Sequence, residues 1–96
     1  MTREQLLDAA RMATADRGIN YGQPEDNFTR IARRWRVHLL NRFGIDIAID
    51  GPSVALMLDD VKSARLENNI THSDSWIDKA GYAACGGEIA SNMSTE

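Results

Sequence analysis

The sequence predicts an all-α fold, a compact domain of four helices, and three observations support this prediction. Apolar residues recur at helical spacing through most of the 96 residues, and no stretch alternates convincingly with a period of two. Glycine, proline and polar clusters divide the chain into four segments of helical length, and helices with such short connections pack as a bundle. Residues 1–96 make one domain with a modest core, so we expect copies of the chain to associate as a homo-oligomer.

The first helix is predicted to begin at Thr2, because Gln5 three residues later completes a capping box. The side chains expected on its buried side are those of Leu6, Leu7, Ala10, Met12 and Ala13. Gly18 is a natural end for this helix. Residues 18–24 then form a turn, since glycine permits a positive φ and Pro24 presets the entry to the next helix.

The second helix is predicted to run from Pro24 to Gly44, with acidic residues in its first turn, where they suit the helix dipole. One continuous apolar stripe follows it at helical spacing, formed by Phe28, Ile31, Ala32, Trp35, Leu39 and Phe43. Residues 45–50 alternate briefly, but a single strand has no partner. We therefore expect a loop whose isoleucines pack against the core.

The third helix is predicted to begin at Gly51 and Pro52, and the fourth near Ser73 after a polar loop. The polar tail, residues 91–96, is expected to fray. Small residues form one side of the fourth helix and let another helix approach closely; these are Ala80, Ala83, Ala84 and Gly87.

Helical phase places an apolar face on the third helix, formed by Val54, Met57, Leu58 and Val61. Arg65 falls in the middle of this face and Lys62 lies at its edge, whereas three acidic residues, Asp59, Asp60 and Glu67, point the other way. A buried arginine needs a carboxylate or an anionic ligand, because a lone buried charge is very costly. The sequence therefore predicts a partner for Arg65.

The fourth helix offers the carboxylates, since Asp74 and Asp78 are four residues apart and share a face with Tyr82 and Cys85. The simplest arrangement places Lys62 and Arg65 against Asp74 and Asp78. One interpretation is an ion-pair network that sets the register of the two helices; the other is a polar cluster that lines a ligand pocket. Two such carboxylates can also hold Mg²⁺, but the two cations compete for them.

The turn at Tyr21 to Pro24, followed by Asn27, is a second candidate site. A helix amino terminus attracts anions, and Tyr21 can stack on a base. The alternative is a rigid turn with an aromatic plug. Cys85 is interpreted as a small core residue, and the two histidines lack a zinc-like spacing.

The net charge of −3 makes nucleic acid an unlikely partner, although five arginines crowd residues 30–42. This basic segment indicates either a local anion site or solvated helix residues. No apolar run approaches the roughly 20 residues that span a membrane, and no signal-peptide core follows Met1. With a single cysteine, these features predict a soluble cytoplasmic protein without a membrane partner.

Several motifs are familiar in combination. They are Tyr21-Gly22-x-Pro24-x-x-Asn27-Phe28-x-x-Ile31-Ala32-x-x-Trp35, then Val54 to Met57 with Lys62 and Arg65, then Asp74-Ser75-Trp76-x-Asp78-x-Ala80-Gly81-Tyr82. Residues 21–88 thereby resemble a family of short phage and prophage proteins catalogued as a domain of unknown function. The resemblance implies phage origin, and hence the cytoplasm of an infected bacterial host.

The chain also resembles, more weakly, the MazG-type all-α nucleoside triphosphate pyrophosphohydrolases. Those are oligomeric helical bundles that bind Mg²⁺ through carboxylates on two adjacent helices. In this sequence the corresponding helix presents Lys62 and Arg65 instead, so the carboxylate set is incomplete. This difference favours nucleotide binding without catalysis.

Three functions follow as hypotheses. The first is a phage protein that sequesters a nucleotide or a nucleotide-derived immune signal without a cofactor, as an anti-defence sponge. Its expected ligand-binding residues are Tyr21, Asn27, Lys62, Arg65, Asp74, Trp76, Asp78 and Tyr82. The second is a Mg²⁺-dependent nucleotide pyrophosphohydrolase. The third is an interaction module that contacts a host protein through Leu56 and Leu66, which lie off the main apolar face.

Overall fold

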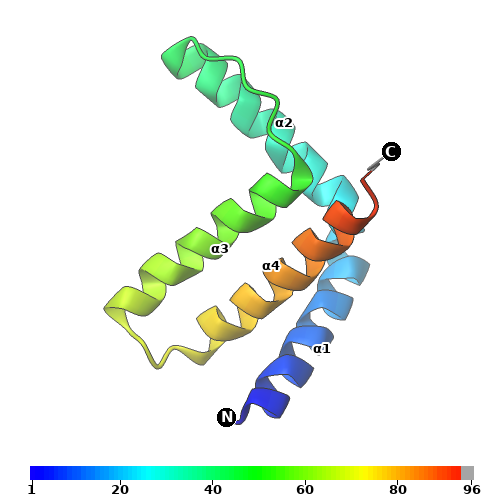
Figure 1. Ribbon diagram of the computed structural model, residues 1–96, viewed down its shortest axis with the longest axis vertical. Helices are drawn as coiled ribbons and strands as arrows, with labels where there is room; N and C mark the ends of the chain where they lie inside the picture. Colours follow the sequence, from blue (N-terminus) through cyan, green and yellow to red (C-terminus); the bar gives the residue numbers. More distant parts are fainter. Residues whose placement is uncertain (94–96) are drawn as a thin grey trace.

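A computed structural model describes residues 1–93 and contains four helices and no strand in that range (Figure 1). These are α1 (Arg3–Tyr21), α2 (Pro24–Phe43), α3 (Gly51–Asn68) and α4 (Ser73–Ser91). The predicted all-α, four-helix fold is confirmed. No helix in the described residues is long and apolar enough to cross a lipid bilayer.

Helices α3 and α4 form an antiparallel hairpin with the most extensive contact in the fold, and α1 lies along the other side of α4 (Figure 1). Helix α2 crosses near the start of α3 and then projects beyond the other three helices. The core lies where α2, α3 and α4 meet, and its buried members are Phe28, Ala32, Val54, Ala55 and Ile89.

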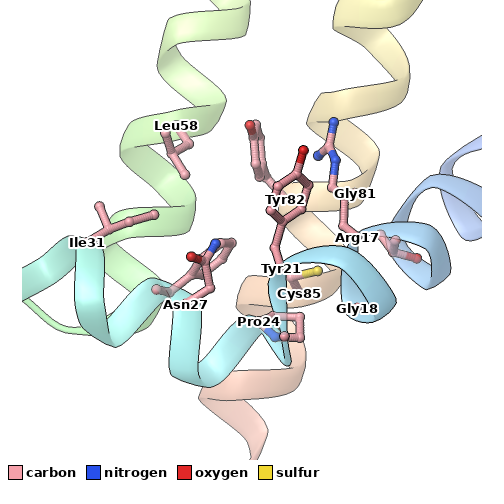
Figure 2. Close-up of a pocket in the computed structure, with 13 residues that line it drawn as sticks. Arg17, Gly18, Tyr21, Pro24, Asn27, Ile31, Leu58, Gly81, Tyr82 and Cys85 are labelled. Atoms are coloured by element: carbon pink, nitrogen blue, oxygen red, sulfur yellow. The ribbon is translucent and has the colours of Figure 1, made fainter.

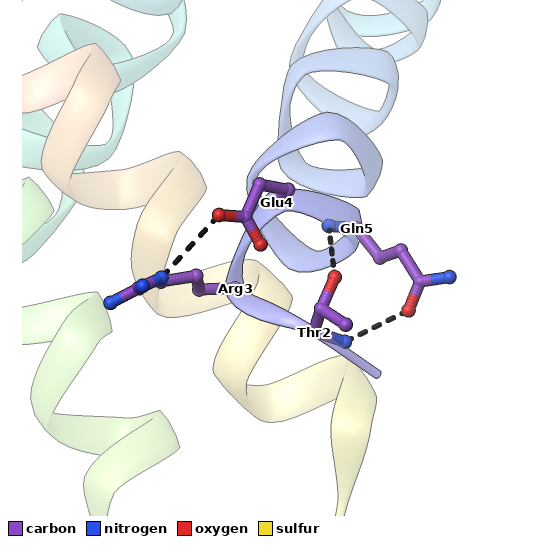
Figure 3. A network of polar contacts seen from close by, with 4 residues as sticks. All are labelled: Thr2, Arg3, Glu4 and Gln5. Atoms are coloured by element: carbon purple, nitrogen blue, oxygen red, sulfur yellow. Dashed lines mark hydrogen bonds and ion pairs between the residues drawn. The ribbon is translucent and has the colours of Figure 1, made fainter.

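The capping box at the start of α1 is confirmed (Figure 3). The Gln5 backbone N–H donates to Thr2 Oγ1 over 3.1 Å, and the Thr2 N–H donates to Gln5 Oε1 over 2.8 Å. Two backbone donors that have no partner inside the helix are thereby satisfied.

Replacing Thr2 with alanine is therefore expected to lower the free energy of unfolding by about 1 kcal/mol. Urea denaturation followed by circular dichroism measures this loss. Thr29→Ala is the matched control, since Thr29 is an exposed threonine inside α2 and alanine is a better helix former. An equal loss in both variants would mean that the cap contributes nothing.

The predicted end of α1 at Gly18 is wrong, because the helix continues to Tyr21. Gly22, with φ of 85°, is the residue that leaves the helical conformation. A glycine inside a helix is tolerated at a modest cost, whereas a positive φ ends the helix. On the expected buried side of α1, Ala10 is buried, but Leu7 and Met12 are exposed.

Helix α2 begins at Pro24 and ends at Phe43, and Gly44 closes it as predicted, in the left-handed conformation at φ of 71°. Residues 45–50 form the expected loop. Of its isoleucines only Ile49 packs against the core, whereas Ile45 and Ile47 are exposed. The prediction that all of them pack inward is wrong, because the loop returns along the projecting part of α2 rather than over the core (Figure 1).

Helix α3 begins at Gly51, where the Asp50 side chain accepts a hydrogen bond of 2.9 Å from the Ser53 N–H. Hydrogen bonds from Ser53 hold the pKa of Asp50 below its usual range. The predicted start of α4 at Ser73 is also confirmed. Ser91 is the last residue of α4, and the expected fraying of residues 91–96 stays a prediction, of which residues 94–96 lie outside the described residues.

The predicted inner face of α3 is confirmed for Val54, which is buried, and for Leu58, which packs against the core, but it is wrong for the remaining residues. Arg65, expected in the middle of the buried face, is exposed, and Leu66, expected on the surface, is buried. Met57 and Val61 are exposed as well. The reason is that α4 presents charged residues to α3, so polar side chains of α3 face inward and pair with them.

Small residues of α4 permit close helix contacts, but not the ones expected. Ala83, Ala84 and Gly87 are exposed. Gly86 instead faces α3, where a Cβ atom on it would lie 2.7 Å from the Ala55 Cβ. Gly81 faces α1 on the other side of α4, opposite Thr14.

Candidate functional site

A pocket of about 260 Å³ lies where the end of α1 and the start of α2 meet α3 and α4 (Figure 2). Figure 2 shows the side chains of Tyr21 and Tyr82 between Arg17 on one side and Asn27, Ile31 and Leu58 on the other. Most of the lining is apolar, and Arg17 is its charged residue. All four helices contribute to this one site.

The turn between α1 and α2 shapes one wall of the pocket. Tyr21 is the last residue of α1, and the positive φ of Gly22 breaks the helix directly after it. Pro24 then starts α2, which places Asn27 in the first turn of that helix, facing the same pocket. The combination of glycine and proline thus sets Tyr21 and Asn27 opposite one another.

Helices α2, α3 and α4 supply the rest of the wall. Ile31 and Leu58 are half-buried and pack against the core, as do Tyr82 and Cys85 of α4. Burial and the nearby charge of Glu88 raise the pKa of the Cys85 thiol, so the thiol stays protonated at neutral pH. A protonated, half-buried thiol is a small apolar wall residue, which agrees with the interpretation from the sequence.

An ion cluster lies beside the pocket, with Asp78 at its centre. Arg17 Nη2 of α1 and Lys62 Nζ of α3 each approach a different oxygen of the Asp78 carboxylate at 2.8 Å. Burial raises the pKa of Asp78, but the hydrogen bond from Lys62 and the charge and hydrogen bond of Arg17 outweigh it, so the pKa lies below its usual range. The three ionised groups together carry one positive charge.

Arg17 connects this cluster to the pocket. Its guanidinium carbon lies 5.8 Å from the centre of the Tyr82 ring, within the range of a cation–π contact, and its side chain is 40% exposed. Arg17 did not emerge from the sequence as a site residue. The available signal was its position four residues before Tyr21, which puts both on one face of α1.

The family model described as "Domain of unknown function (DUF6378)" matches residues 4–90. The chain belongs to this family. Every residue that lines the pocket falls within the matched range.

Curated relatives of this DUF6378 chain come from two mycobacteriophages. It is 35% identical over 85 residues to the Gene 55 protein of Mycobacterium phage D29. The aligned region covers 88% of this chain and 52% of that protein. It is also 31% identical over 78 residues to the Gene 55 protein of Mycobacterium phage L5, and this alignment covers 81% of this chain and 47% of that protein. The chain thus spans about half the length of these relatives. No solved structure matches it significantly.

The phage relatives support the phage origin that the motifs indicate. The site residues expected from the sequence separate into three groups in this DUF6378 chain. Tyr21, Asn27 and Tyr82 line the pocket, and Asp78 and Lys62 pair beside it.

Arg65, Asp74 and Trp76 lie away from the pocket. Arg65 and Asp74 are exposed, and neither forms an ion pair with another described residue. The Trp76 Nε1 atom donates a 2.9 Å hydrogen bond to the Ile70 carbonyl, which anchors the loop between α3 and α4. Of the expected cluster of Lys62 and Arg65 against Asp74 and Asp78, the structure therefore contains the pair of Lys62 with Asp78, whereas Arg65 and Asp74 take no part in it.

The rotation of α3 explains this result. Lys79 of α4 pairs with Asp59 of α3 at 2.8 Å and also donates to the Ser63 hydroxyl. Asp59 was expected on the far side of α3. Two ion pairs of opposite polarity, Lys62 with Asp78 and Asp59 with Lys79, therefore join the two helices and leave Arg65 on the outside.

Within residues 1–93, no group of three or more His, Cys, Asp or Glu side chains is placed to hold a metal ion. Asp78, one of the two carboxylates considered for Mg²⁺, instead binds two cationic side chains. What the arrangement offers chemically is an apolar, aromatic pocket next to a cationic cluster.

Proposed function

We propose that the chain is a non-catalytic binding protein that holds a nucleotide-type small molecule in the pocket formed by its four helices. The base lies against Tyr21 and Tyr82, and an anionic group of the ligand lies beside Arg17. The observation that carries this proposal is one pocket that combines two tyrosines, an amide and a positively charged rim.

The size of the pocket limits how much of a ligand enters it. Ligand pockets usually measure roughly 300–1,000 Å³, and this one, at about 260 Å³, is slightly smaller. A base and part of its sugar are suitable occupants. Phosphates then remain at the mouth, where they reach the exposed side of Arg17.

The chemistry of the lining suits a base. Stacking on an aromatic side chain contributes roughly 1–3 kcal/mol per base, and both tyrosines face the pocket. The Asn27 side-chain amide has both a donor and an acceptor, which can pair with the edge of a base. The apolar side chains of Ile31 and Leu58 exclude water from the opposite wall.

The charge beside the pocket favours an anion. Phosphate binding was expected of Lys62 and Arg65. Lys62 instead forms an ion pair with Asp78, and Arg65 is exposed and lies away from the pocket. Arg17 takes this role in the proposal, because its pairing with Asp78 leaves part of the guanidinium accessible. An arginine fork suits bidentate contact with phosphate.

In a phage protein, such a pocket would serve to sequester its ligand from the host. A nucleotide-derived immune signal is the class of ligand that we infer for this role. The phage relatives support a role during phage infection, and the aromatic lining of the pocket supports a nucleotide-type ligand.

The test is isothermal titration calorimetry of the purified protein with AMP, GMP and cyclic di-GMP, and with adenosine as a probe without phosphate. Arg17→Ala is expected to weaken nucleotide binding about tenfold, the effect of losing one charge-assisted contact, and to change adenosine binding little. Tyr21→Ala is expected to weaken both.

Arg3→Ala is the matched control, since Arg3 is an exposed arginine of the same helix that pairs only with Glu4 among the described residues (Figure 3). Binding that is unchanged in folded Arg17→Ala and Tyr21→Ala proteins would contradict the proposal. Pyrophosphate release from a nucleoside triphosphate with Mg²⁺ would replace it with the enzyme hypothesis.

A further inference from the structure

Residues 30–50, here called the arm, comprise most of α2 and the loop that returns from it, and the arm projects from the other helices (Figure 1). The arm contacts the core through Ile31, Trp35 and Ile49 near its base. Farther out, the loop is tied to the helix by the pair of Arg36 and Asp46, whose atoms approach to 2.6 Å. The outer part of the arm thus projects with no other helix of the described residues beside it (Figure 1).

The outer part of the arm exposes large apolar side chains. Five of them lie within eleven residues, and each is about half exposed or more: Val37, Leu40, Phe43, Ile45 and Ile47. Single exposed apolar residues are normal, but a group of this size marks a contact site. The arm therefore has the surface of a protein interface.

The total solvent-accessible surface area also indicates that part of the surface is a protein interface. The chain exposes 6957 Å², whereas a folded monomer of this mass exposes about 5,500 Å². Its radius of gyration is 14.7 Å, against about 12.5 Å for a compact domain of this length. The excess of about 1,450 Å² exceeds the roughly 800 Å² that each partner buries in a standard interface.

A second apolar surface lies on the outer face of α3, formed by Leu56, Met57 and Val61, all exposed. Helical phase places Met57 and Val61 on the side of α3 away from α4, whereas Leu56 lies at the edge of this face, next to α4. The exposed carboxylate of Asp60 lies among these residues in the sequence. The face is thus apolar with an acidic residue, whereas the arm is apolar with basic residues.

The charges of the two surfaces indicate whether the arm of one copy contacts the arm or the body of another copy. The arm contains five arginines and two aspartates, a net charge of +3, while the whole chain carries −3, so the remainder carries −6. Arg30, Arg33 and Arg34 are exposed and form no ion pair with any described residue. Two arms would repel each other, whereas the arm of one copy and the body of another attract.

We propose that the protein is a two-fold symmetric homodimer in which the arm of each copy packs on the outer face of α3 of the other. This arrangement buries both apolar surfaces, places the arginines against the acidic body, and closes after two copies. It does not depend on the ligand proposed above, because none of the exposed apolar residues of the two surfaces lines the pocket.

The first experiment measures mass by light scattering at about 50 µM protein, which lies above the micromolar to picomolar dissociation constants of interfaces of standard size. The wild type is expected at twice the chain mass of 10.7 kDa. Leu40→Glu in the arm and Leu56→Glu on α3 are each expected to weaken dimerisation at least about tenfold, since each buries a charge in an apolar contact. Leu7→Glu, at an exposed leucine of α1, is the control expected to remain dimeric.

The second experiment identifies the surfaces in contact, in a Cys85→Ser background. Chains with Leu40→Cys are mixed with chains that carry Leu56→Cys and are oxidised; a disulfide-linked pair of the two is expected. Linkage within Leu40→Cys protein alone would mean that arm meets arm and would overturn the proposal. A wild-type monomer would also overturn it, and a monomer that binds duplex DNA in low salt would assign the arginines of the arm to nucleic acid instead.

Discussion

Replacing Asp78 with alanine is expected to lower the free energy of unfolding by about 3 kcal/mol, the cost of removing one partner from a largely buried ion pair. The Lys62 ammonium and the Asp78 carboxylate have side-chain exposures of 13% and 15%, so water cannot replace the lost partner. Arg17 is more exposed and tolerates the loss better. Chemical denaturation followed by circular dichroism at pH 7 measures the change.

Asp74→Ala is the matched control, because Asp74 lies one turn earlier in α4, is exposed and forms no ion pair with a described residue. Its loss is expected to change stability by at most about 0.5 kcal/mol. Equal effects of the two substitutions would mean that the pair of Lys62 and Asp78 contributes little to the fold.

The contribution of Asp78 also depends on pH in a definite direction. Its pKa in the folded protein lies below the value of about 3.9 in an unfolded chain, because Lys62 and Arg17 stabilise the carboxylate. The stabilisation is present above the unfolded pKa and is lost as pH falls through the folded pKa. The difference in stability between the wild type and Asp78→Asn is therefore expected to shrink below about pH 4, and a difference that is constant from pH 7 to pH 3 would contradict this assignment.

Helix boundaries were predictable where a local interaction determines them. Thr2 with Gln5, Pro24, Gly44 and the start of α3 act through a few neighbouring residues, so the sequence contains the full cause. Gly18 shows the limit of this reasoning, because a glycine ends a helix only where it adopts a positive φ itself, and Gly18 remains helical. Here Gly22 adopts the positive φ, four residues later.

The inner face of α3 was not predictable from apolar residues alone. Met57 and Val61 are apolar and exposed, while Asp59 and Lys62 are charged and face α4. The charges lie inward because Lys79 and Asp78 of α4 satisfy them, and this pairing depends on two segments that are about 20 residues apart. A pattern read along one helix contains no information about its partner.

The candidate site was predictable in part for the same reason. Tyr21 and Asn27 flank one turn, so their proximity is a local property of the chain. Tyr82 belongs to α4 and Arg17 to α1, and the contact of these helices at Gly81 and Thr14 brings them together. The exposed apolar residues of α3 and of the arm show that burial within one copy does not account for every apolar residue.

Replacing Gly86 with alanine is expected to lower the free energy of unfolding by about 2 kcal/mol, because overpacking of a close contact usually costs roughly 1–3 kcal/mol. A Cβ atom at this position would lie 2.7 Å from the Ala55 Cβ, and neither atom belongs to a flexible side chain. Helices α3 and α4 would have to separate at their most extensive contact. Urea denaturation measures the loss.

The neighbouring glycine supplies the control, since a Cβ atom on Gly87 would meet no atom within 4 Å. Gly87→Ala is expected to raise stability by up to about 1 kcal/mol, the gain in helix propensity. Ala55→Gly removes the atom that obstructs position 86, so in that background Gly86→Ala is expected to cost little or to stabilise. If the cost of Gly86→Ala stays the same when Ala55 is glycine, the close approach at this pair does not limit the packing of the two helices.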